Sequence, residues 1–426
     1  MIEKICKKTP QQYIKCNLQG YNLSKNEFFM KNIAEIGIVG LGARGAFCFG
    51  ELIQKRNDCR IAAVCDINKV RLKHIAEKFN VSQTYTDLEQ MLKNEKLDGL
   101  IITTPDAEHE KCAVTALNHG VNILLDKPLA TSRQGGLNII EAAEKSGRIA
   151  MMGFNLRHAP LLKKLKEIVD EGVLGRIILI ENREFYDGGR TYMSRWNGRK
   201  SYSGGLWNHK GSHDFDIFNW LLNFPAPKKV SAFSGMSVFT PDNFPFELEN
   251  GIQPGPCCSK CYYCQKGICR DSFPVTDENM WGEEAVADDG YRKDSCMYMS
   301  DLSVHDNGIA MVEYENGVRA SHLECFVCGM SDRFYTVTGD RGLATLRLSG
   351  NTIEVIKRWT WEKITYEVSL SHNDLHGGAD PILLKAFVET ILGKRENKAT
   401  LEQGLIATTI AEAAELSKEE NRTILL

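Results

Sequence analysis

Apolar and polar positions follow a repeating order from residue 33 to residue 154. Short apolar runs are separated by longer segments in which apolar residues recur every three or four positions. The apolar runs, which we predict to be buried strands, cover residues 33–39, 60–66, 97–105, 121–128 and 149–154. The segments between them, which we predict to be helices, cover residues 46–55, 68–79, 107–120 and 132–147. Strands that alternate with helices in this way predict a doubly wound parallel sheet, an α/β architecture.

The pattern changes after Phe154. An amphipathic segment over 159–175 ends in a glycine and predicts a helix, and the segment 212–222 predicts another. Runs with strand character cover residues 176–185, 228–236, 308–326, 333–348 and 351–357, and two of them contain the hairpin-type turns "YENGV" and "TGDRG". Two helices, near 381–392 and 401–418, close the chain. This half is predicted to be an α+β domain with a large, mostly antiparallel open sheet.

These patterns divide the 426 residues into regions. Residues 1–32 lack periodicity, and we interpret them as an N-terminal arm and a candidate oligomer contact. Residues 33–154 form the parallel-sheet domain, and residues 155–426 form the α+β domain. Within the second domain, residues 239–300 are rich in Pro, Gly, Cys and Asp and lack periodicity. Because a loop of that length in a compact domain is usually functional or held together by cross-links, we predict a specialised insertion there.

Composition excludes several classes of partner. The formal net charge of −3 gives no basic surplus for nucleic acid or for a membrane surface. No apolar run approaches the roughly 18 residues that span a bilayer, and the first twenty residues lack the apolar core of a signal peptide. We therefore expect a cytoplasmic protein with reduced thiols, which binds neither nucleic acid nor membrane.

A glycine-rich turn follows the first predicted strand and begins the first predicted helix. It comprises Gly40, Leu41, Gly42, Ala43, Arg44 and Gly45, a G-x-G-x-x-G motif. Such glycines permit a tight turn and the close approach of a pyrophosphate to a helix N-terminus, whose free N–H groups favour anions. The motif predicts a dinucleotide site. A glycine turn in an α/β protein without a nucleotide is the alternative. Arg44 would favour a phosphate or simply be solvated.

Asp66 ends the second predicted strand, 21 residues after Gly45. A carboxylate at this position accepts hydrogen bonds from the hydroxyls of the adenine ribose. It would also repel a 2′-phosphate, so the sequence favours NAD over NADP.

Further motifs follow the glycine-rich turn in a set order: "TTPDAEH", "DKPLA", "GFNLRHAPLLKKLKEIVDEGVLG" and "GGLWNHKGSHDFDIFNWLL". Together they resemble the Gfo/Idh/MocA oxidoreductase family, strongly over about residues 33–240 and in outline over the later sheet. The resemblance implies a Rossmann domain and a C-terminal α/β domain whose open sheet often makes oligomer contacts, so a homodimer or homotetramer is expected. It also implies hydride transfer between NAD(P) and a secondary alcohol of a sugar or cyclitol.

The E-K-P motif of that family is represented here by Asp126, Lys127 and Pro128. The resemblance places Lys127, with Asp126, beside the nicotinamide and in contact with the reacting hydroxyl. It also places Thr104, Pro105 and His109 in the loop that lines the cofactor. Independently, Lys127 follows a buried parallel strand at its carboxyl end, where open α/β sheets bind ligands. A lysine partly desolvated there has a lowered pKa and stabilises a developing alkoxide. The alternative is a solvated loop lysine.

His213 begins an apolar helix and is the second catalytic candidate. In the family this histidine is the acid/base and is assisted by an aspartate four residues earlier, a position that His209 occupies here. Lys210 is adjacent, as in some branches of the family. An unperturbed imidazole transfers protons near neutral pH, and Asp216 is a candidate to orient His213. The alternative is a histidine that only caps the helix.

The sugar contacts are predicted from residues with planar donors or aromatic faces. The candidates are Asn155, Arg157, Tyr186, Trp196, Trp207, His209 and Lys210, with Arg190 and Arg195 nearby. A mixture of aromatic rings and planar donors suits a carbohydrate. An ordinary surface loop is the alternative.

Cysteines concentrate in "PGPCCSKCYYCQKGIC", where Cys258, Cys261, Cys264 and Cys269 have metal-ligand spacing. The spacing is similar to that of the structural zinc lobe of medium-chain alcohol dehydrogenases, so zinc is one prediction. The same run fits a [4Fe–4S] cluster, and free or regulatory thiols are a third reading. Either metal would give the insertion the core that it lacks.

The sequence therefore predicts an NAD-dependent oxidoreductase that transfers hydride between the nicotinamide and a secondary ring hydroxyl of a sugar or glycoside, with C3 favoured. One alternative is a redox-neutral, NAD-dependent glycosidase that acts by transient oxidation and elimination. Another is an inositol or polyol dehydrogenase. A binding or sensor protein on the same fold is disfavoured by the presence of Lys127 and His213.

Overall fold

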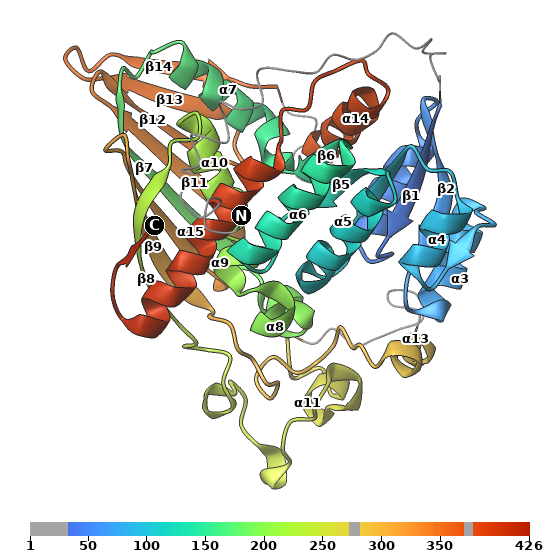
Figure 1. The fold of residues 1–426 in the computed structure, drawn as a ribbon. Coiled ribbons are helices and arrows are strands. Elements are labelled where there is room, and N and C mark those ends of the chain that lie inside the picture. Colours follow the sequence, from blue (N-terminus) through green and yellow to red (C-terminus); the bar gives the residue numbers. More distant parts are fainter. Residues whose placement is uncertain (1–32, 272–281, 370–377) are drawn as a thin grey trace.

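The computed structural model describes residues 33–271, 282–369 and 378–426. The predicted N-terminal arm, residues 1–32, lies outside this part of the chain. Two sheets organise the described residues, and Figure 1 shows them on opposite sides of a layer of helices. This confirms the predicted combination of a parallel α/β sheet with a mostly antiparallel one.

The first sheet has six strands in the order β3-β2-β1-β4-β5-β6, and every neighbouring pair is parallel. Its strands are β1 (Ala34–Val39), β2 (Cys59–Cys65), β3 (Thr84–Tyr85), β4 (Gly99–Ile102), β5 (Asn122–Asp126) and β6 (Ala150–Gly153). The apolar runs form these strands because both faces of a wound parallel sheet are buried. The short strand β3 was not predicted.

Helices join the parallel strands. They are α2 (Glu51–Gln54), α3 (Lys69–Phe79), α4 (Leu88–Asn94), α5 (His109–Asn118) and α6 (Arg133–Ser146). Asn68 caps α3 and Ser132 caps α6. Each side chain accepts a hydrogen bond from the backbone N–H of the residue three positions later. Two details differ from the prediction: α4 was missed, and the expected helix over 46–55 is a π-helical turn, Gly45–Gly50, followed by the short α2.

The second sheet has nine strands in the order β14-β13-β12-β11-β7-β10-β9-β8-β15. They are β7 (Ile177–Asp187), β8 (Pro227–Gly235), β9 (Asn307–Tyr314), β10 (Arg319–Cys325), β11 (Val327–Gly339), β12 (Gly342–Arg347), β13 (Thr352–Lys357), β14 (Lys363–Glu367) and β15 (Ile424–Leu425). The pair β7–β10 is parallel and the other neighbours are antiparallel. The short strands β14 and β15 were not predicted.

Helices of the described residues cover one face of the second sheet and leave its other face uncovered. The covering helices are α7 (Pro160–Asp170), α10 (Ser212–Leu221) and α15 (Leu401–Glu420), which contact β13, β10 and β8 respectively. On the uncovered face the apolar side chains of Phe233, Ile309 and Met311 are exposed. The alternation along β9 explains this, since Ala310 and Val312 point into the core while the residues between them point out.

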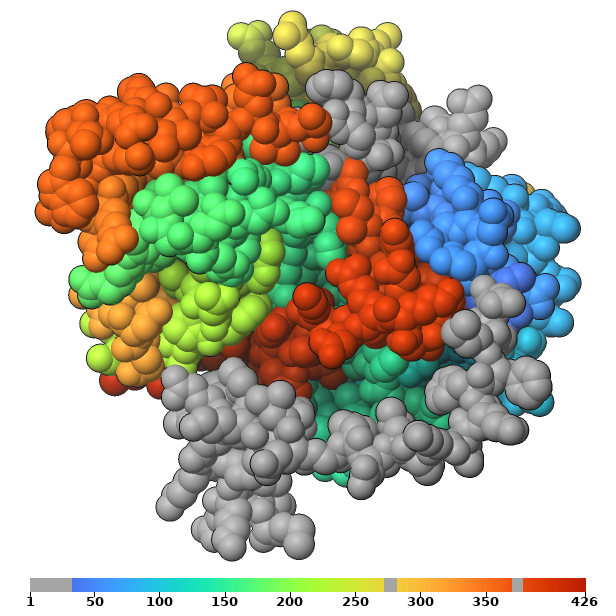
Figure 2. Space-filling model, turned by 90° about the horizontal axis from the view of Figure 1, so that it is seen from above, coloured from blue at the N-terminus to red at the C-terminus, as the bar shows by residue number. Residues whose placement is uncertain are grey.

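The C-terminal helices join the two sheets. Helix α14 (Ala379–Ile391) contacts α2 and the π-helical turn, and α15 packs against both α6 and β8. In Figure 2 these red helices fill the space between the blue half, which holds the parallel sheet, and the green and orange half, which holds the second sheet. Among the described residues, no helix combines the length and the apolar composition needed to cross a membrane.

The Cys-rich insertion leaves and re-enters the second sheet between two adjacent strands. Gly235 at the end of β8 pairs with Asn307 at the start of β9. The buried carboxylate of Asp306 accepts the backbone N–H groups of Ser237, Val238 and Phe239, at distances of 2.7 to 3.2 Å. The insertion includes α11 (Tyr262–Gln265) and α13 (Gly282–Asp289). Figure 1 shows it as the yellow segment below both sheets.

The glycine-rich turn is close-packed at two of its three glycines. Gly40 has φ +85°, and an added Cβ would lie 2.7 Å from the backbone of Thr103. An added Cβ on Gly45 would lie 2.1 Å from the carbonyl oxygen of Gly40. An added Cβ on Gly42 would meet no atom within 4 Å. The fold therefore requires glycine at the first and third positions but not at the second.

We predict that Gly45→Ala lowers the free energy of unfolding by about 1–3 kcal/mol, because the new methyl group collides with the backbone of Gly40. Gly42→Ala is the matched control, and we expect it to unfold at the same denaturant concentration as the wild type. Chemical denaturation followed by circular dichroism measures both. Equal stability of the two variants would contradict this account of the turn.

Candidate active site

The glycine-rich turn and Asp66 meet at the carboxyl ends of β1 and β2. The Asp66 carboxylate accepts the N–H groups of Leu41 (2.7 Å) and Asn68 (2.9 Å) and forms an ion pair with Arg71 (2.8 Å). A Cβ on Gly42 would project into space that no protein atom occupies. A glycine that the protein's own packing does not need fits a site where a pyrophosphate approaches the backbone, so the turn suits the predicted dinucleotide.

Arg44 is bound by the protein itself. Its guanidinium forms ion pairs with Asp126 at 3.0 Å and with Asp380 at 3.1 Å. Asp380 lies in the first turn of α14, so Arg44 connects the glycine-rich turn to the C-terminal helices. This differs from the predicted role in phosphate binding, and we assign Arg44 to the contact between the two halves of the molecule.

Lys127 lies at the end of β5, where the two halves of the molecule meet. Its Nζ donates a hydrogen bond to the backbone carbonyl of His209 at 2.5 Å. Burial lowers the pKa of Lys127, although the nearby carboxylates of Asp106 and Asp126 act in the opposite direction. A partly desolvated lysine with a lowered pKa exchanges protons near neutral pH more readily than a solvated one.

His209 occupies the position of the family's aspartate, and its imidazole is paired with the carboxylate of Asp106. Its Nδ1 lies 2.7 Å from Asp106 Oδ2, and its Nε2 lies 2.9 Å from the side-chain amide of Asn197. Trp196 packs edge-on against the imidazole, with ring centroids 5.1 Å apart. Burial lowers the pKa of His209 well below its ordinary value, so this imidazole is neutral near pH 7. Asp106, which the sequence did not single out, therefore links His209 to the surroundings of Lys127.

His213 lies in the first turn of α10, four residues after the carbonyl that Lys127 contacts, as predicted from the sequence. It is almost buried, with 8% of its surface exposed. Asp216, suggested as its orienting partner, instead binds the guanidinium of Arg157 through both carboxylate oxygens. Two of the three nitrogens of this buried guanidinium face the carboxylate, and the third donates to the carbonyl of Lys398 and to the side chain of Gln403, so we assign Asp216 and Arg157 to the packing of α10.

Two other predicted sugar contacts are also buried. Trp207 has no exposed surface and packs between Phe215 and His305, so its indole is part of the core and does not reach a ligand. Asn155 is 1% exposed and donates to Asp380 at 2.9 Å. The aromatic content that suggested carbohydrate binding thus includes a core residue.

His109 is buried between the loop of Thr104 and the turn at Pro128. It is 1% exposed, and its ring nitrogens lie 2.7 Å from the carbonyl oxygen of Pro128 and 3.2 Å from that of Thr104. The imidazole therefore ties the loop of Thr104 and Pro105 to the turn after Lys127. His109 therefore lies between the two segments that the prediction assigned to the nicotinamide end of the cofactor.

Lys210 belongs to a buried ionic group on the inner face of the second sheet. Its ammonium forms an ion pair with Glu184 at 3.0 Å and lies 4.4 Å from the ring centroid of Tyr186. Arg333 pairs with the same Glu184 at 2.8 Å and with Asp214 at 3.2 Å. Burial favours the neutral amine of Lys210, but Glu184 outweighs it and raises the pKa, so the ammonium persists.

Sequence reasoning missed this ionic group, although the strands carry a signal for it. The positions that point into the core are Ile180, Asn182 and Glu184 on β7 and Ala320, His322 and Glu324 on β10. Polar residues at inward positions of a half-buried strand indicate a buried polar network. Extending the period-two alternation along "ILIENREF" and "ASHLECF" would have identified them.

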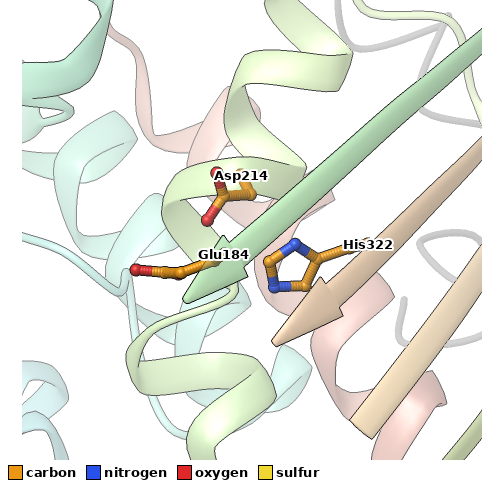
Figure 3. A group of neighbouring side chains, drawn as sticks. All are labelled: Glu184, Asp214 and His322. Atoms are coloured by element: carbon orange, nitrogen blue, oxygen red, sulfur yellow. The ribbon is translucent and has the colours of Figure 1, made fainter. Parts of the chain in front are cut away.

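Glu184, Asp214 and His322 point toward one another from β7, α10 and β10 (Figure 3). In the described part of the chain they are the one group of three or more His, Cys, Asp or Glu side chains whose ligand atoms all lie within 4.8 Å of one another. Arg333 already supplies positive charge between the two carboxylates. We therefore interpret the group as an ionic network and not as a metal site.

The predicted metal ligands do not form such a group. Cys258, Cys261, Cys264 and Cys269 form no disulfide bond, and no three of their sulfurs lie within 4.8 Å of one another. The thiol of Cys269 has a pKa lowered by a hydrogen bond with Cys264. The arrangement thus gives no support to the zinc or the [4Fe–4S] prediction, and it shows a hydrogen bond between two of the thiols, those of Cys264 and Cys269.

Comparison with known sequences agrees with this geometry. Residues 34–154 match a family model described as an oxidoreductase family with an NAD-binding Rossmann fold, and residues 166–426 match the model of its C-terminal alpha/beta domain. The chain is 28% identical over 395 residues to a protein named YteT from Bacillus subtilis (strain 168), which covers 86% of this chain and 89% of that protein.

Two relatives carry names that state an activity. The identity is 27% over 188 residues with inositol 2-dehydrogenase 2 of Saccharopolyspora erythraea and 27% over 205 residues with D-glucoside 3-dehydrogenase of Escherichia coli (strain K12). These matches cover 44% and 48% of this chain and 53% and 58% of the two relatives, so the chain spans little more than half of their length.

Among solved structures, levoglucosan dehydrogenase in complex with NADH and levoglucosan has the same fold. The TM-score is 0.71 at 15% sequence identity, over 92% of this chain and 99% of that chain. The two family models together cover both halves of the molecule, including the turn at Gly42 and the segment of Lys127. The chain therefore belongs to the Gfo/Idh/MocA family of oxidoreductases, with an NAD-binding Rossmann domain and a C-terminal alpha/beta domain.

Proposed function

We propose that this protein is an NAD-dependent dehydrogenase that oxidises a secondary ring hydroxyl of a sugar or glycoside. The observation that carries the proposal is Lys127, half-buried between acidic side chains at the end of β5 and bonded to the carbonyl of His209 across the two halves of the molecule. Its place at the carboxyl end of a parallel strand, beside a turn that suits a dinucleotide, is where this fold binds ligands.

The cofactor would be held by residues of the first domain. The turn around Gly42 would contact the pyrophosphate, Asp66 the adenine ribose, and the loop of Thr104 and Pro105 the nicotinamide end. When bound, NAD accepts a hydride from the carbon of the alcohol and leaves the hydroxyl proton to the protein. A carboxylate side chain at the position of Asp66, beside the ribose site, would repel a 2′-phosphate, which supports NAD over NADP.

Lys127 and His213 would accept and return the proton of the hydroxyl group. An amine with a lowered pKa accepts the proton as the hydride departs, and its ammonium form stabilises the alkoxide in the reverse direction. His209 holds Lys127 in place through its backbone carbonyl, and the carboxylate of Asp106 in turn holds the imidazole of His209. The neutral imidazole of His209 adds no charge to the site, unlike an aspartate at this position.

The substrate class is supported by aromatic side chains that remain accessible near His209 and Lys210. Trp196, which packs against His209, and Tyr186, which packs against Lys210, are each half-buried and offer aromatic faces. Oxidation at C3 of a glucoside is supported by the likeness to D-glucoside 3-dehydrogenase, and an inositol by the likeness to inositol 2-dehydrogenase 2. We favour the glycoside because the aromatic loop suits a larger ligand.

The assay that tests the proposal follows two products at once. Protein purified without oxygen is incubated with NAD and with α- and β-glucosides, and NADH absorbance and free glucose are recorded together. NADH with an intact glycosidic bond is the expected result. Glucose released without net NADH would move the assignment to the redox-neutral glycosidase. NADH with inositols alone would move it to a polyol dehydrogenase.

We predict that Lys127→Ala lowers kcat for alcohol oxidation by about 100- to 10,000-fold, because a positioned acid/base contributes a factor of this size. The dissociation constant for NAD, measured by calorimetry, should stay within about threefold of the wild type because the turn and Asp66 are unchanged. Lys111→Ala, on the exposed side of α5, is the control and should have wild-type activity. Turnover that survives Lys127→Ala would overturn the mechanism.

The pH profile offers a second test of Lys127. Burial lowers its pKa to about 8, from an ordinary value of 10.5. Oxidation needs the neutral amine, so kcat/KM for the alcohol should rise with pH through this lowered value. Asp106→Asn removes a carboxylate that raises the pKa, so the rise should move to lower pH by on the order of one unit.

Glu108→Gln is the matched control for the pH profile, because Glu108 lies two residues from Asp106 and is exposed. We expect the profile of Glu108→Gln to coincide with that of the wild type. An Asp106→Asn profile that did not move, or that moved to higher pH, would show that another group controls the alkaline limb.

The uncovered face of the second sheet supports the proposed homo-oligomer. Phe233 on β8 pairs across the strands with Ile309 on β9, and Met311 follows two residues later. These side chains are 67%, 45% and 47% exposed. Adjacent large apolar side chains on a regular sheet face are costly to leave in water, so a second copy of the chain would cover them.

We predict that the double variant Ile309→Glu, Met311→Glu has a smaller molar mass in solution than the wild type, because four like charges would meet across a two-fold interface. Light scattering after size exclusion measures this. Ile382→Glu, at an exposed position on α14, is the control and should keep the wild-type mass. A wild-type protein that is monomeric would contradict the prediction.

A further inference from the structure

One segment of the Cys-rich insertion docks onto the nucleotide-binding domain. We call residues 282–294, which comprise α13 and the five residues after it, the bridge segment. The carbonyl of Ala285 accepts a hydrogen bond from the side-chain amide of Asn68 at 2.7 Å. The carboxylate of Asp288 accepts the backbone N–H of Lys69, in the first turn of α3, at 2.5 Å. Asn68 and Lys69 directly follow the segment of Asp66, so the bridge segment touches the predicted ribose site.

Arg71 lies between this site and the bridge segment. Its guanidinium pairs with Asp66 at 2.8 Å and with Asp289 at 3.2 Å. All three side chains are largely buried, with exposures of 13%, 4% and 9%. A guanidinium held between two carboxylates keeps one partner if it releases the other. Asp289 therefore allows Arg71 to leave Asp66 without becoming a buried, unpaired charge.

The hydrogen bonds at Asp66 show why such a release matters. A carboxylate offers about four acceptor sites. Three donors already use them, namely the N–H groups of Leu41 and Asn68 and the guanidinium of Arg71. The adenine ribose presents two vicinal hydroxyls. Both reach Asp66 only if Arg71 gives up its place, and Asp289 is positioned to take Arg71 over.

The bridge segment continues along the same site. Lys293 lies close enough to Arg71, Arg195 and Asp66 that each affects its charge, and burial lowers its pKa to about 8. Ile67, between Asp66 and Asn68, is 74% exposed and offers an apolar surface to a flat base. The polar site at Asp66, the apolar side chain of Ile67 and the bridge segment thus lie around the place where the adenosine would bind.

The bridge segment is anchored to the rest of the insertion. The backbone carbonyl of Asp294 accepts the N–H of Cys258 at 2.8 Å. The fully buried carboxylate of Asp294 accepts the N–H and hydroxyl of Ser259 and pairs with Arg292 at 2.9 Å. The bridge segment is therefore held at one end by the residues around Cys258 and at the other end by α3.

We propose that the bridge segment forms the outer wall of the adenosine subsite, and that Asp289 is the residue that draws Arg71 away from Asp66 when the ribose of a dinucleotide binds. This inference rests on the proposed function and extends it, because it gives the Cys-rich insertion a part in cofactor binding. The ligand class is an adenosine diphosphoribose moiety. The nicotinamide end and the sugar lie outside this subsite.

The test compares Asp289→Asn with Glu284→Gln, which removes the same charge at an exposed position of the same helix. Calorimetry with NAD and with ADP-ribose measures the dissociation constants. We expect Asp289→Asn to raise both by the same factor, about tenfold, the size of one hydrogen bond to a charged group. Glu284→Gln should match the wild type. The KM for the alcohol at saturating NAD should not change in either variant.

Amide hydrogen exchange gives a second measurement that does not depend on a variant. We expect ADP-ribose to slow exchange over residues 282–294 of the wild type and to leave residues 257–269 unchanged. Absence of protection, or an Asp289→Asn protein that binds as tightly as Glu284→Gln, would overturn the inference while leaving the proposed function intact. A wild-type protein that binds neither NAD nor ADP-ribose would overturn both.

Discussion

The structure depends on placing one ammonium group, that of Lys127, out of bulk water. A partly buried cation is costly unless carboxylates and carbonyl oxygens compensate it. Here Asp106 and Asp126 come from the first domain, and the carbonyl of His209 comes from the second. Groups from both domains therefore compensate the lysine, and the C-terminal helices that pack against both sheets hold those groups together. The Arg44–Asp380 ion pair reinforces that contact from the glycine-rich turn.

The second sheet contributes a rigid base for this junction. Glu184, Arg333 and Asp214 form ion pairs beneath the short helix that carries His209 and the start of α10. Lys210 joins them through Glu184. Buried ionic groups of this kind contribute little net stability but fix geometry, since each partner is costly to leave alone. Glu184 keeps Lys210 protonated, while burial shifts Lys127 toward its neutral form.

The architecture and the centre of the site were predictable from the sequence, because local patterns encode them. Period-two and period-3.6 alternations identified most strands and helices, and the spacing from Gly45 to Asp66 located the turn and the acid that meet in space. The individual sugar contacts were not predictable. Trp207 and Arg157 carry the side chains expected of a carbohydrate site, yet a core tryptophan and a buried ion pair look the same in a sequence. Glu184, His322 and Arg333 meet only through long-range strand pairing. The docking of residues 282–294 on α3 had no local signal either.

The way the insertion joins the second sheet leaves the pairing of the strands independent of the insertion. Gly235 and Asn307 face each other as a cross-strand pair at the end of two adjacent antiparallel strands, and Asp306 ties the strand end to the first residues of the excursion. In topological terms the whole Cys-rich lobe is the loop of a β-hairpin. A tight turn could span the same two residues without altering the register of a single strand. The lobe thus enters and leaves the sheet through the least demanding connection that a sheet provides, and its length does not constrain the pairing of the strands.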